Sequence, residues 1–168
     1  MKFGKVDNPE GIDFTLPKDH STTQSLFEAS KGELKPLIYI GCPKWNKKDL
    51  RNFYPKGTKD ELSYYSTQFN SIELNATFYQ RYPFEQFEKW KNQTEDGFVF
   101  FPKITQQISH YRQLKNVADL VDEYLVAVTG LGHKLGTIFL QLNARYSPKH
   151  LQKLIDFVNH WPIDVKLA

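Results

Sequence analysis

The sequence predicts an α/β fold of parallel strands and covering helices, in the manner of a TIM-like (β/α)8 barrel. Strand-then-helix units follow one another along the 168-residue chain, and this alternation favours a parallel sheet. The segment 98–103 is an almost continuous apolar run, typical of a strand covered on both faces. Residues 164–168 read as the opening of a fifth strand. Because such a barrel typically needs about 250 residues, we expect only about its first half, namely four βα units plus the start of a fifth strand.

The chain is expected to consist of an N-terminal arm and one domain. Residues 1–36 carry Gly, Pro, Asp, Ser and Lys without sustained periodicity, and a short helix near 25–30 is their one candidate element. Such an arm is ordered only where it packs on something. Residues 37–168 hold all the expected strands and are expected to form the truncated barrel domain.

The first βα unit is expected to begin with a strand at 37–40 that ends at Gly41. A helical stretch around 48–53 follows it. Thr58, with Glu61 three residues later, forms a capping box, which predicts the start of the next helix. The inner face of that helix carries an apolar stripe at helical spacing, made of Leu62, Tyr65 and Phe69.

The remaining units repeat this alternation. We expect a strand at 71–76, a helix that opens at Pro83, a strand at 98–103, a helix capped by Asn116, a strand at 136–141 and a final helix that starts at Ser147-Pro148. The inward stripes of these three helices are expected to contain Phe84, Phe87 and Trp90, then Val117, Leu120, Val121, Tyr124 and Leu125, and last Leu151, Leu154, Ile155 and Val158.

Composition and charge leave the class of partner open. Hydrophobic residues make up 40% of the chain and charged residues 24%, which are ordinary values for a globular protein. A net charge of +3 and a pI of about 8.8 permit an anionic partner without requiring one. Acidic and basic residues alternate along the expected helices, whereas a nucleic-acid-binding face concentrates Lys and Arg. A mixed, solvated surface is therefore the favoured interpretation.

Cysteine usage and hydropathy indicate the compartment. Cys42 is the only cysteine, so no intrachain disulfide can form, which fits a reducing compartment. The N-terminus has no apolar signal core, and no stretch approaches the roughly 18 apolar residues of a membrane span. We therefore expect a cytoplasmic protein with no membrane partner.

Glu73 is the most informative polar residue. Strand alternation places Ile72 and Leu74 toward the helices and Glu73 inside the barrel. An unpaired carboxylate there would be costly or would hold a proton at neutral pH. Lys103, at the end of the neighbouring strand, is the obvious partner. The pair either fixes packing alone or supplies an acid/base or ligand-anchoring carboxylate at the mouth of the barrel.

Other candidates follow the strand ends, where the loops of such a barrel form its functional face. His110 can act as a general acid or base, or hold an anion together with Arg112, although a lone histidine is more often structural. The residues expected to bind a ligand are Trp45, Asn75, Thr77, Tyr79, Arg112 and Gln141. Alternatively, these residues form hydrogen bonds with backbone groups of the loops or pack over neighbouring side chains.

Cofactor motifs give no positive signal. No His/Asp/Glu cluster has ligand spacing, so a metal centre is not expected. The chain also lacks a Gly-rich phosphate loop, a G-x-S-x-G elbow and a dinucleotide fingerprint, which leaves the cofactor unknown. Cys42 ends the first strand, where a nucleophile could sit, but a small buried thiol without a basic partner is the commoner state.

Several segments together resemble the YecE-like family, the domain-of-unknown-function family numbered seventy-two. The resemblance rests on E-x-N-x-T-F-Y at 73–79 and extends through 40–45, 53–55, 69–79, 97–103, 108–110 and 135–142. It implies a TIM-like barrel, a natural domain that continues past Ala168, and no settled biochemical activity.

Three functions are compatible with these residues. The first is an enzyme or a ligand-binding pocket for a small anionic or phosphorylated substrate, in which Glu73 is the acid/base and Lys103 and His110 hold the anion. The second is a nucleic-acid-binding module, suggested by the basic pI and the loop aromatics. The third is an inactive fragment that needs the missing half barrel, supplied by self-association or by a separate chain. Whether the chain is an enzyme at all is left open by the sequence.

Overall fold

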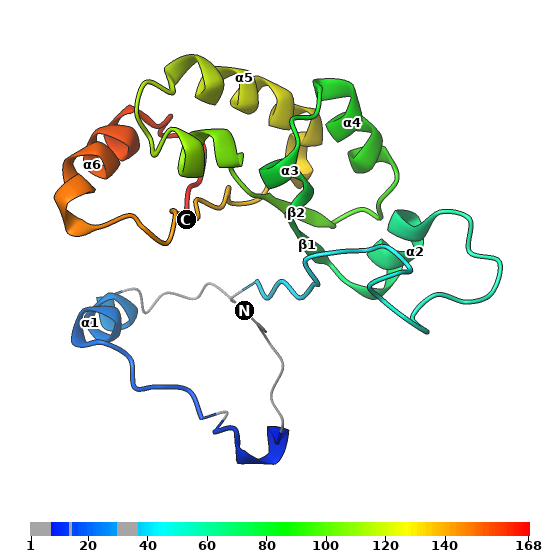
Figure 1. The fold of residues 1–168 in the computed structure, drawn as a ribbon. Helices are drawn as coiled ribbons and strands as arrows, with labels where there is room; N and C mark the ends of the chain where they lie inside the picture. Colours follow the sequence, from blue (N-terminus) through cyan, green and yellow to red (C-terminus); the bar gives the residue numbers. More distant parts are fainter. Residues whose placement is uncertain (1–7, 14, 30–36) are drawn as a thin grey trace. The chain divides into compact units, whose positions relative to one another are not determined.

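The computed structural model describes residues 8–13, 15–29 and 37–168 and divides the chain into two compact units, 1–37 and 38–168. The first unit contains a 3₁₀ turn at Pro9–Gly11 and helix α1 (Ser21–Ala29), which buries none of its residues (Figure 1). The helix expected near 25–30 therefore begins earlier, and residue 30 lies outside the described ranges. Among the described helices, none combines the length and apolarity needed to cross a membrane.

The second unit is built on two short parallel strands, β1 (Ser71–Leu74) and β2 (Val99–Pro102). Their register pairs Ser71 with Val99 and Leu74 with Pro102. The expected strand at 71–76 is thus shorter, because helix α3 (Ala76–Tyr79) begins directly after Asn75.

Two further segments extend this parallel arrangement by isolated bridges. Next to β2, the N–H of Gly136 donates to the carbonyl of Phe100 at 2.8 Å, and that of Phe139 donates to Pro102 at 2.8 Å. The segment 166–168 then lies parallel to 138–140, where the N–H of Leu140 donates to the carbonyl of Ala168 at 2.7 Å. The parallel order therefore follows the order of the chain.

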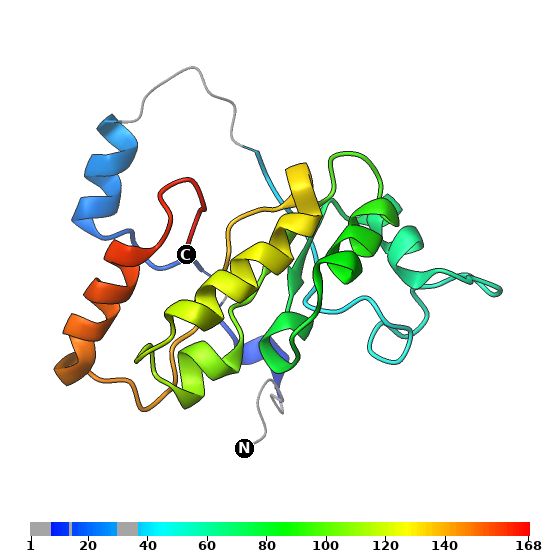
Figure 2. The same ribbon diagram turned by 90° about the horizontal axis from the view of Figure 1, so that it is seen from above.

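Helices cover one face of the strands. The longer ones are α2 (Glu61–Gln68), α4 (Phe84–Asn92), α5 (Ala118–Val128) and α6 (Leu151–His160), and the shorter turns are a π-helical turn at Gln107–Tyr111 and 3₁₀ segments at Thr129–Lys134 and Pro148–His150. Figures 1 and 2 show α4 and α5 side by side over β1 and β2.

The hydrophobic core lies between this face of the strands and the helices. Ile72, Leu74 and Phe100 have no exposed surface, as the strand alternation predicts. Phe87 and Trp90 of α4 and Tyr124 and Val128 of α5 are buried against the same core. The side chains of Glu73 and Phe101, one position along each strand, point to the opposite face, which the helices leave open.

The expected first strand is not a strand in the structure. The segment 38–40 is held by the side-chain amide of Asn70, which accepts from the N–H of Ile40 at 2.7 Å and donates to the carbonyl of Ile38 at 2.8 Å. The Asn70 side chain thus makes the hydrogen bonds to the backbone of this segment that a neighbouring strand would otherwise make. Gly41 follows, and a Cβ there would lie 2.0 Å from the carbonyl oxygen of Ser71, so only glycine fits this approach.

The helices expected at 48–53, from Thr58 and from Asn116 also begin elsewhere or do not form, because local backbone geometry and side-chain hydrogen bonds differ from the expected ones. Residues 48–53 form turns, since Asn52 adopts a positive φ of 63°. Asp60 caps α2 by accepting from the N–H of Ser63 at 3.0 Å, whereas the Thr58 hydroxyl donates to the carbonyl of Pro55. Asn116 precedes the cap of α5, which is Val117.

Helix α6 buries a different face from the expected one. Leu154 and Phe157 contact the core, and Phe157 is 8% exposed. The expected inward residues Leu151, Ile155 and Val158 are exposed instead. Helix α6 carries apolar residues on two faces, so the apolar spacing alone did not identify the face that packs against the core.

A buried lysine closes the end of α4. Lys134 is 4% exposed, and its ammonium group donates to the carbonyls of Lys91 at 2.9 Å and Thr94 at 2.8 Å and to the Thr94 hydroxyl at 3.1 Å. Burial lowers the pKa of Lys134, and the carboxylates of Asp96 and Glu95 oppose that effect. The contacts satisfy carbonyl groups that the end of a helix leaves without partners.

We expect Lys134→Met to lower the free energy of unfolding by about 1–3 kcal/mol, because the carbonyls of Lys91 and Thr94 lose a buried, charged donor. Urea unfolding followed by circular dichroism measures the change. Lys89→Met, on the exposed side of the same helix, is the matched control. Equal stability of the two variants would contradict the capping role.

Candidate functional site

The strand register brings Glu73 and Lys103 together. Glu73 is paired with Phe101 across β1 and β2, and Lys103 lies two positions further along on the same face. The Lys103 Nζ is 3.9 Å from the Glu73 Oε1 atom. The Lys103 side chain is 12% exposed and that of Glu73 is 44% exposed, so the cation is the more deeply enclosed partner.

Two aromatic rings flank the Lys103 ammonium group. Its Nζ lies 5.2 Å from the ring centroid of Phe78 and 5.5 Å from that of Phe139. Electron-rich ring faces stabilise a cation at such distances. The His110 ring packs edge-to-face on the same Phe78, with centroids 4.9 Å apart. Phe78 is thus the common contact of Lys103 and His110.

Phe78 and Phe139 were not among the site residues predicted from the sequence. Phe78 stands between Thr77 and Tyr79, both of which were expected to bind a ligand. The signal that could have found Phe78 is its place just after a strand that carries a charged inward residue, because an enclosed cation favours an aromatic neighbour.

His110 is oriented by its neighbour in a π-helical turn. The turn is closed by a bond from the N–H of Arg112 to the carbonyl of Gln107 at 3.0 Å. The buried hydroxyl of Ser109 donates to the carbonyl of Thr105 at 3.2 Å and lies 2.9 Å from His110 Nδ1. Since that hydroxyl has one proton, we infer that Nδ1–H donates to it and that Nε2 keeps a free lone pair. Burial lowers the pKa of His110, and the charge of Lys103 adds to the effect.

Thr77 joins the two strand ends rather than facing a ligand. Its side chain is 2% exposed. Its hydroxyl oxygen lies 2.8 Å from the carbonyl oxygen of Leu74 and 2.7 Å from that of Lys103, and it accepts from the N–H of Lys103 at 3.1 Å. The one proton of the hydroxyl and one of its two lone pairs are therefore used within the fold.

Of the other residues predicted to bind a ligand, some lie near Glu73, Lys103 and His110 and others do not. Asn75 is partly buried beside the site, and Tyr79 is 72% exposed with its ring against Phe78. Trp45 packs instead on Trp90 of α4, with centroids 5.8 Å apart. Arg112 and Gln141 are exposed, and within the described ranges their side chains make no hydrogen bond or ion pair. The structure thus places Lys103 and His110 against Phe78, with Glu73 beside Lys103, and leaves Trp45 elsewhere.

A hollow of about 340 Å³ adjoins Glu73 on the open face of the strands. Its wall is partly aromatic, with Tyr39, Phe101 and Phe139 among its lining residues. Tyr39 and Phe101 pack edge-to-face at 5.3 Å. The described residues hold no group of three His, Cys, Asp or Glu side chains that could bind a metal ion. The wall of the hollow therefore presents one carboxylate, that of Glu73, beside aromatic rings, and Lys103 and His110 are not among its lining residues.

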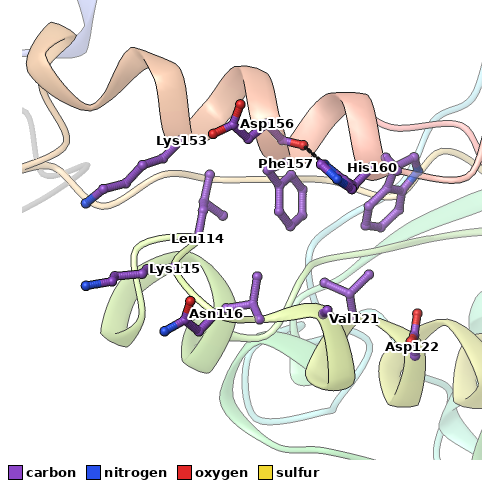
Figure 3. A pocket seen from close by; sticks show the side chains of 12 residues that line it. Leu114, Lys115, Asn116, Val121, Asp122, Lys153, Asp156, Phe157 and His160 are labelled. Atoms are coloured by element: carbon purple, nitrogen blue, oxygen red, sulfur yellow. Dashed lines mark hydrogen bonds between the residues drawn. The ribbon is translucent and has the colours of Figure 1, made fainter.

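A larger hollow of about 580 Å³ separates α6 from the start of α5. Figure 3 shows Phe157, Leu114 and Val121 directed into it, while Lys153 reaches down from α6 at one end of the groove. None of the residues that the sequence singles out for chemistry lines this groove. It is a gap between two incompletely packed helices rather than a cluster of reactive groups.

Comparison with known proteins identifies the family. The sequence profile of the family described as "Protein of unknown function DUF72" matches residues 39–168. The chain belongs to this family. The matched range contains Glu73, Lys103 and His110, so the site lies within the DUF72 domain.

Relatives of this DUF72 chain carry no assigned reaction in their names. The UPF0759 protein YecE of Escherichia coli K12 is 34% identical over 129 residues, which cover 75% of this chain and 45% of that protein. The UPF0759 protein YunF of Bacillus subtilis is 30% identical over 113 residues, covering 62% and 39%. The chain therefore spans less than half the length of the curated relatives it matches.

A solved structure shares the fold. A DUF72 family protein from Enterococcus faecalis V583 superposes with a TM-score of 0.64 at 19% identity, over 79% of this chain and 50% of that one. At this identity the similarity shows the α/β fold alone.

We expect Thr77→Val to lower the free energy of unfolding by about 1–3 kcal/mol, because the N–H and carbonyl of Lys103 lose a buried partner. Chemical denaturation measures the loss. Thr77→Ser keeps the hydroxyl and serves as the control, with most of the stability retained. If valine were tolerated as well as serine, the strand ends would not depend on this bond.

The pKa of His110 is expected below the usual histidine value of about 6.5. The unfolded chain then binds more protons than the native one between the two pKa values, so the free energy of unfolding falls as pH is lowered through that window. NMR titration of the imidazole protons gives the pKa directly, and His110→Gln should remove this part of the pH dependence. Lys103→Met should raise the pKa of His110, because it removes a neighbouring positive charge. A native pKa at or above the usual value would refute this description of the site.

Proposed function

We propose that the chain binds a small anionic ligand, such as a phosphorylated molecule, at the carboxyl ends of its strands, and that Lys103 is the anchor. The observation that carries the proposal is the placement of Lys103: its ammonium group is enclosed between Phe78 and Phe139 beside a single carboxylate. A cation in this position is preorganised and incompletely paired.

The pairing of Lys103 leaves room for a ligand. The 3.9 Å separation from Glu73 is longer than the about 2.7–2.9 Å of a direct charge-assisted hydrogen bond. An ammonium group has three donors, and within the described residues the Lys103 Nζ makes no hydrogen bond at normal distance. A phosphate or carboxylate oxygen would provide the missing acceptor.

Two nearby groups can carry a proton for a bound anion. His110 keeps its Nε2 lone pair and a lowered pKa, so it is neutral and basic near pH 7. Glu73 is half-exposed on the side of Lys103 away from the core. We assign Glu73 and His110 as acid/base residues and Lys103 as the anion-binding residue, with Asn75 beside them as a polar contact.

The proposed architecture is the first half of a TIM-like barrel. Its support is the order of the parallel segments, which run from β1 through β2 and 135–139 to 166–168 in chain order. The extent of the relatives, about twice that of the chain, is in line with a further half. In such barrels the active site forms at the carboxyl ends of the strands, where Lys103 lies.

Binding of inorganic phosphate, measured by calorimetry at fixed ionic strength, tests the proposal. Lys103→Met should weaken binding roughly 10- to 100-fold, the value of a lost charged hydrogen bond. Glu73→Gln should keep or tighten it, because the competing carboxylate is gone. Lys56→Met, at an exposed loop position, is the matched control.

Unchanged affinity in Lys103→Met would remove Lys103 as the anchor. Loss of cooperative thermal unfolding in Glu73→Gln would show instead that the Glu73–Lys103 pair is structural. Circular dichroism melts of all three variants distinguish these outcomes from a simple loss of binding.

A further inference from the structure

A separate hollow lies beside the indole rings of Trp45 and Trp90, between the start of helix α2 and helix α4. Its volume is about 350 Å³, within the range of roughly 300–1,000 Å³ that is usual for small-molecule sites. The rest of its lining is mainly polar. Glu73, Lys103 and His110 are not among its lining residues, so the hollow is distinct from the proposed anion site.

The indole N–H groups of two tryptophans are free at this hollow. Trp45 is half-buried, and Trp90 is 7% exposed. Neither indole N–H donates a hydrogen bond to a described residue, and neither is among the unpaired side-chain groups that are fully buried. Both groups are therefore accessible to a molecule from outside the chain. The Trp161 indole differs, because its N–H donates to the carbonyl of Val165 at 2.8 Å.

Two glutamine side chains on and just after α4 add free polar groups to the lining. The Gln93 Nε2 atom donates to Asp60 Oδ2 at 2.8 Å, while Asp60 Oδ1 accepts from the N–H of Ser63 at the start of α2. Because a carboxylate only accepts, this bond fixes the orientation of the amide and leaves Gln93 Oε1 as a free acceptor. Within the described ranges the half-buried Gln86 amide makes no hydrogen bond, and its polar atoms are not fully buried.

The charged residues of the lining balance one another. Lys59 and Lys89 are its cations, and Asp60 and Glu61 are its anions. Equal numbers of opposite charges give no preference for a charged ligand of either sign. A purely apolar ligand is also disfavoured, because it would strip water from the polar groups without replacing their hydrogen bonds.

We propose that this hollow binds a neutral sugar ring, with a C–H face of the sugar against Trp45 and its hydroxyl groups on the amides of Gln86 and Gln93. A hydroxyl group both donates and accepts, which suits a lining that mixes indole donors with amide oxygens. A large indole ring gives apolar contact area beside these polar groups. The sugar ring has the same combination, with apolar C–H groups on its faces and hydroxyl groups around its edge.

The indole N–H signals in two-dimensional proton–nitrogen NMR spectra of the native chain test the proposal. The probes are the methyl glycosides of glucose, galactose, mannose and N-acetylglucosamine, added one at a time at millimolar concentration. At least one of them should shift the signals of Trp45 and Trp90 in a saturable way. The Trp161 signal should stay in place, because its N–H is already bonded. Glycerol, which has hydroxyl groups but no ring, is the control probe.

Gln86→Ala should weaken binding of the responding glycoside by roughly three- to tenfold, as expected for one neutral hydrogen bond. Glu85→Ala is the matched control, since Glu85 is exposed on the same helix and does not line the hollow. Phosphate binding by Gln86→Ala should equal that of the native chain, because Lys103 lies outside this hollow. The sugar site and the anion site can therefore fail separately.

The proposal is wrong if no glycoside shifts the Trp45 and Trp90 signals, or if the Trp161 signal shifts with them. Equal affinity of Gln86→Ala and the native chain for the responding glycoside would also contradict it. A saturable shift of both indole signals by inorganic phosphate, with none from the glycosides, would identify an anion site instead.

Discussion

The hydroxyl of Thr77 is the contact on which the arrangement of this domain depends. It joins the end of β1 to the first residue after β2, through the carbonyl of Leu74 and both backbone groups of Lys103. The two strands have only four residues each, so their own ladder constrains their ends weakly. A buried side-chain bond at that position fixes the backbone of Lys103 and, through it, the direction in which the ammonium group leaves the sheet.

Two pockets lie on opposite sides of this bond. On the open face, Lys103 extends past Glu73 between two aromatic rings. On the helix face, Thr77 and Tyr124 line a small apolar pocket. The strand alternation separates a charged surface from an apolar one within a single layer of backbone. The domain can therefore present two chemically different cavities without any insertion into its fold.

Much of this arrangement could be predicted from the sequence, and the failures have local causes. The pairing of Glu73 with Lys103 was predicted correctly from their positions on two neighbouring parallel strands. Side chains alternate between the two faces of a strand, so the position of a residue along the strand determines its face. The strand expected at 37–40 failed because Asn70, thirty residues away, supplies hydrogen bonds that no local pattern encodes. Trp45 was expected at the mouth, but tertiary packing placed it on Trp90. Phe78 was missed because the four-residue helix α3 is too short to give a periodic signal.

The π-helical turn before Arg112 imposes a length requirement on the loop after β2. Its wide hydrogen-bonded ring contains one residue more than an α-helical turn would, and the His110 ring that meets Phe78 lies within this turn. Removing a single residue would restore the ordinary pitch and rotate the imidazole by about 100° around the helix axis. A one-codon deletion would separate the histidine from its aromatic neighbour and would also shift Ile108, which the same turn buries in the core.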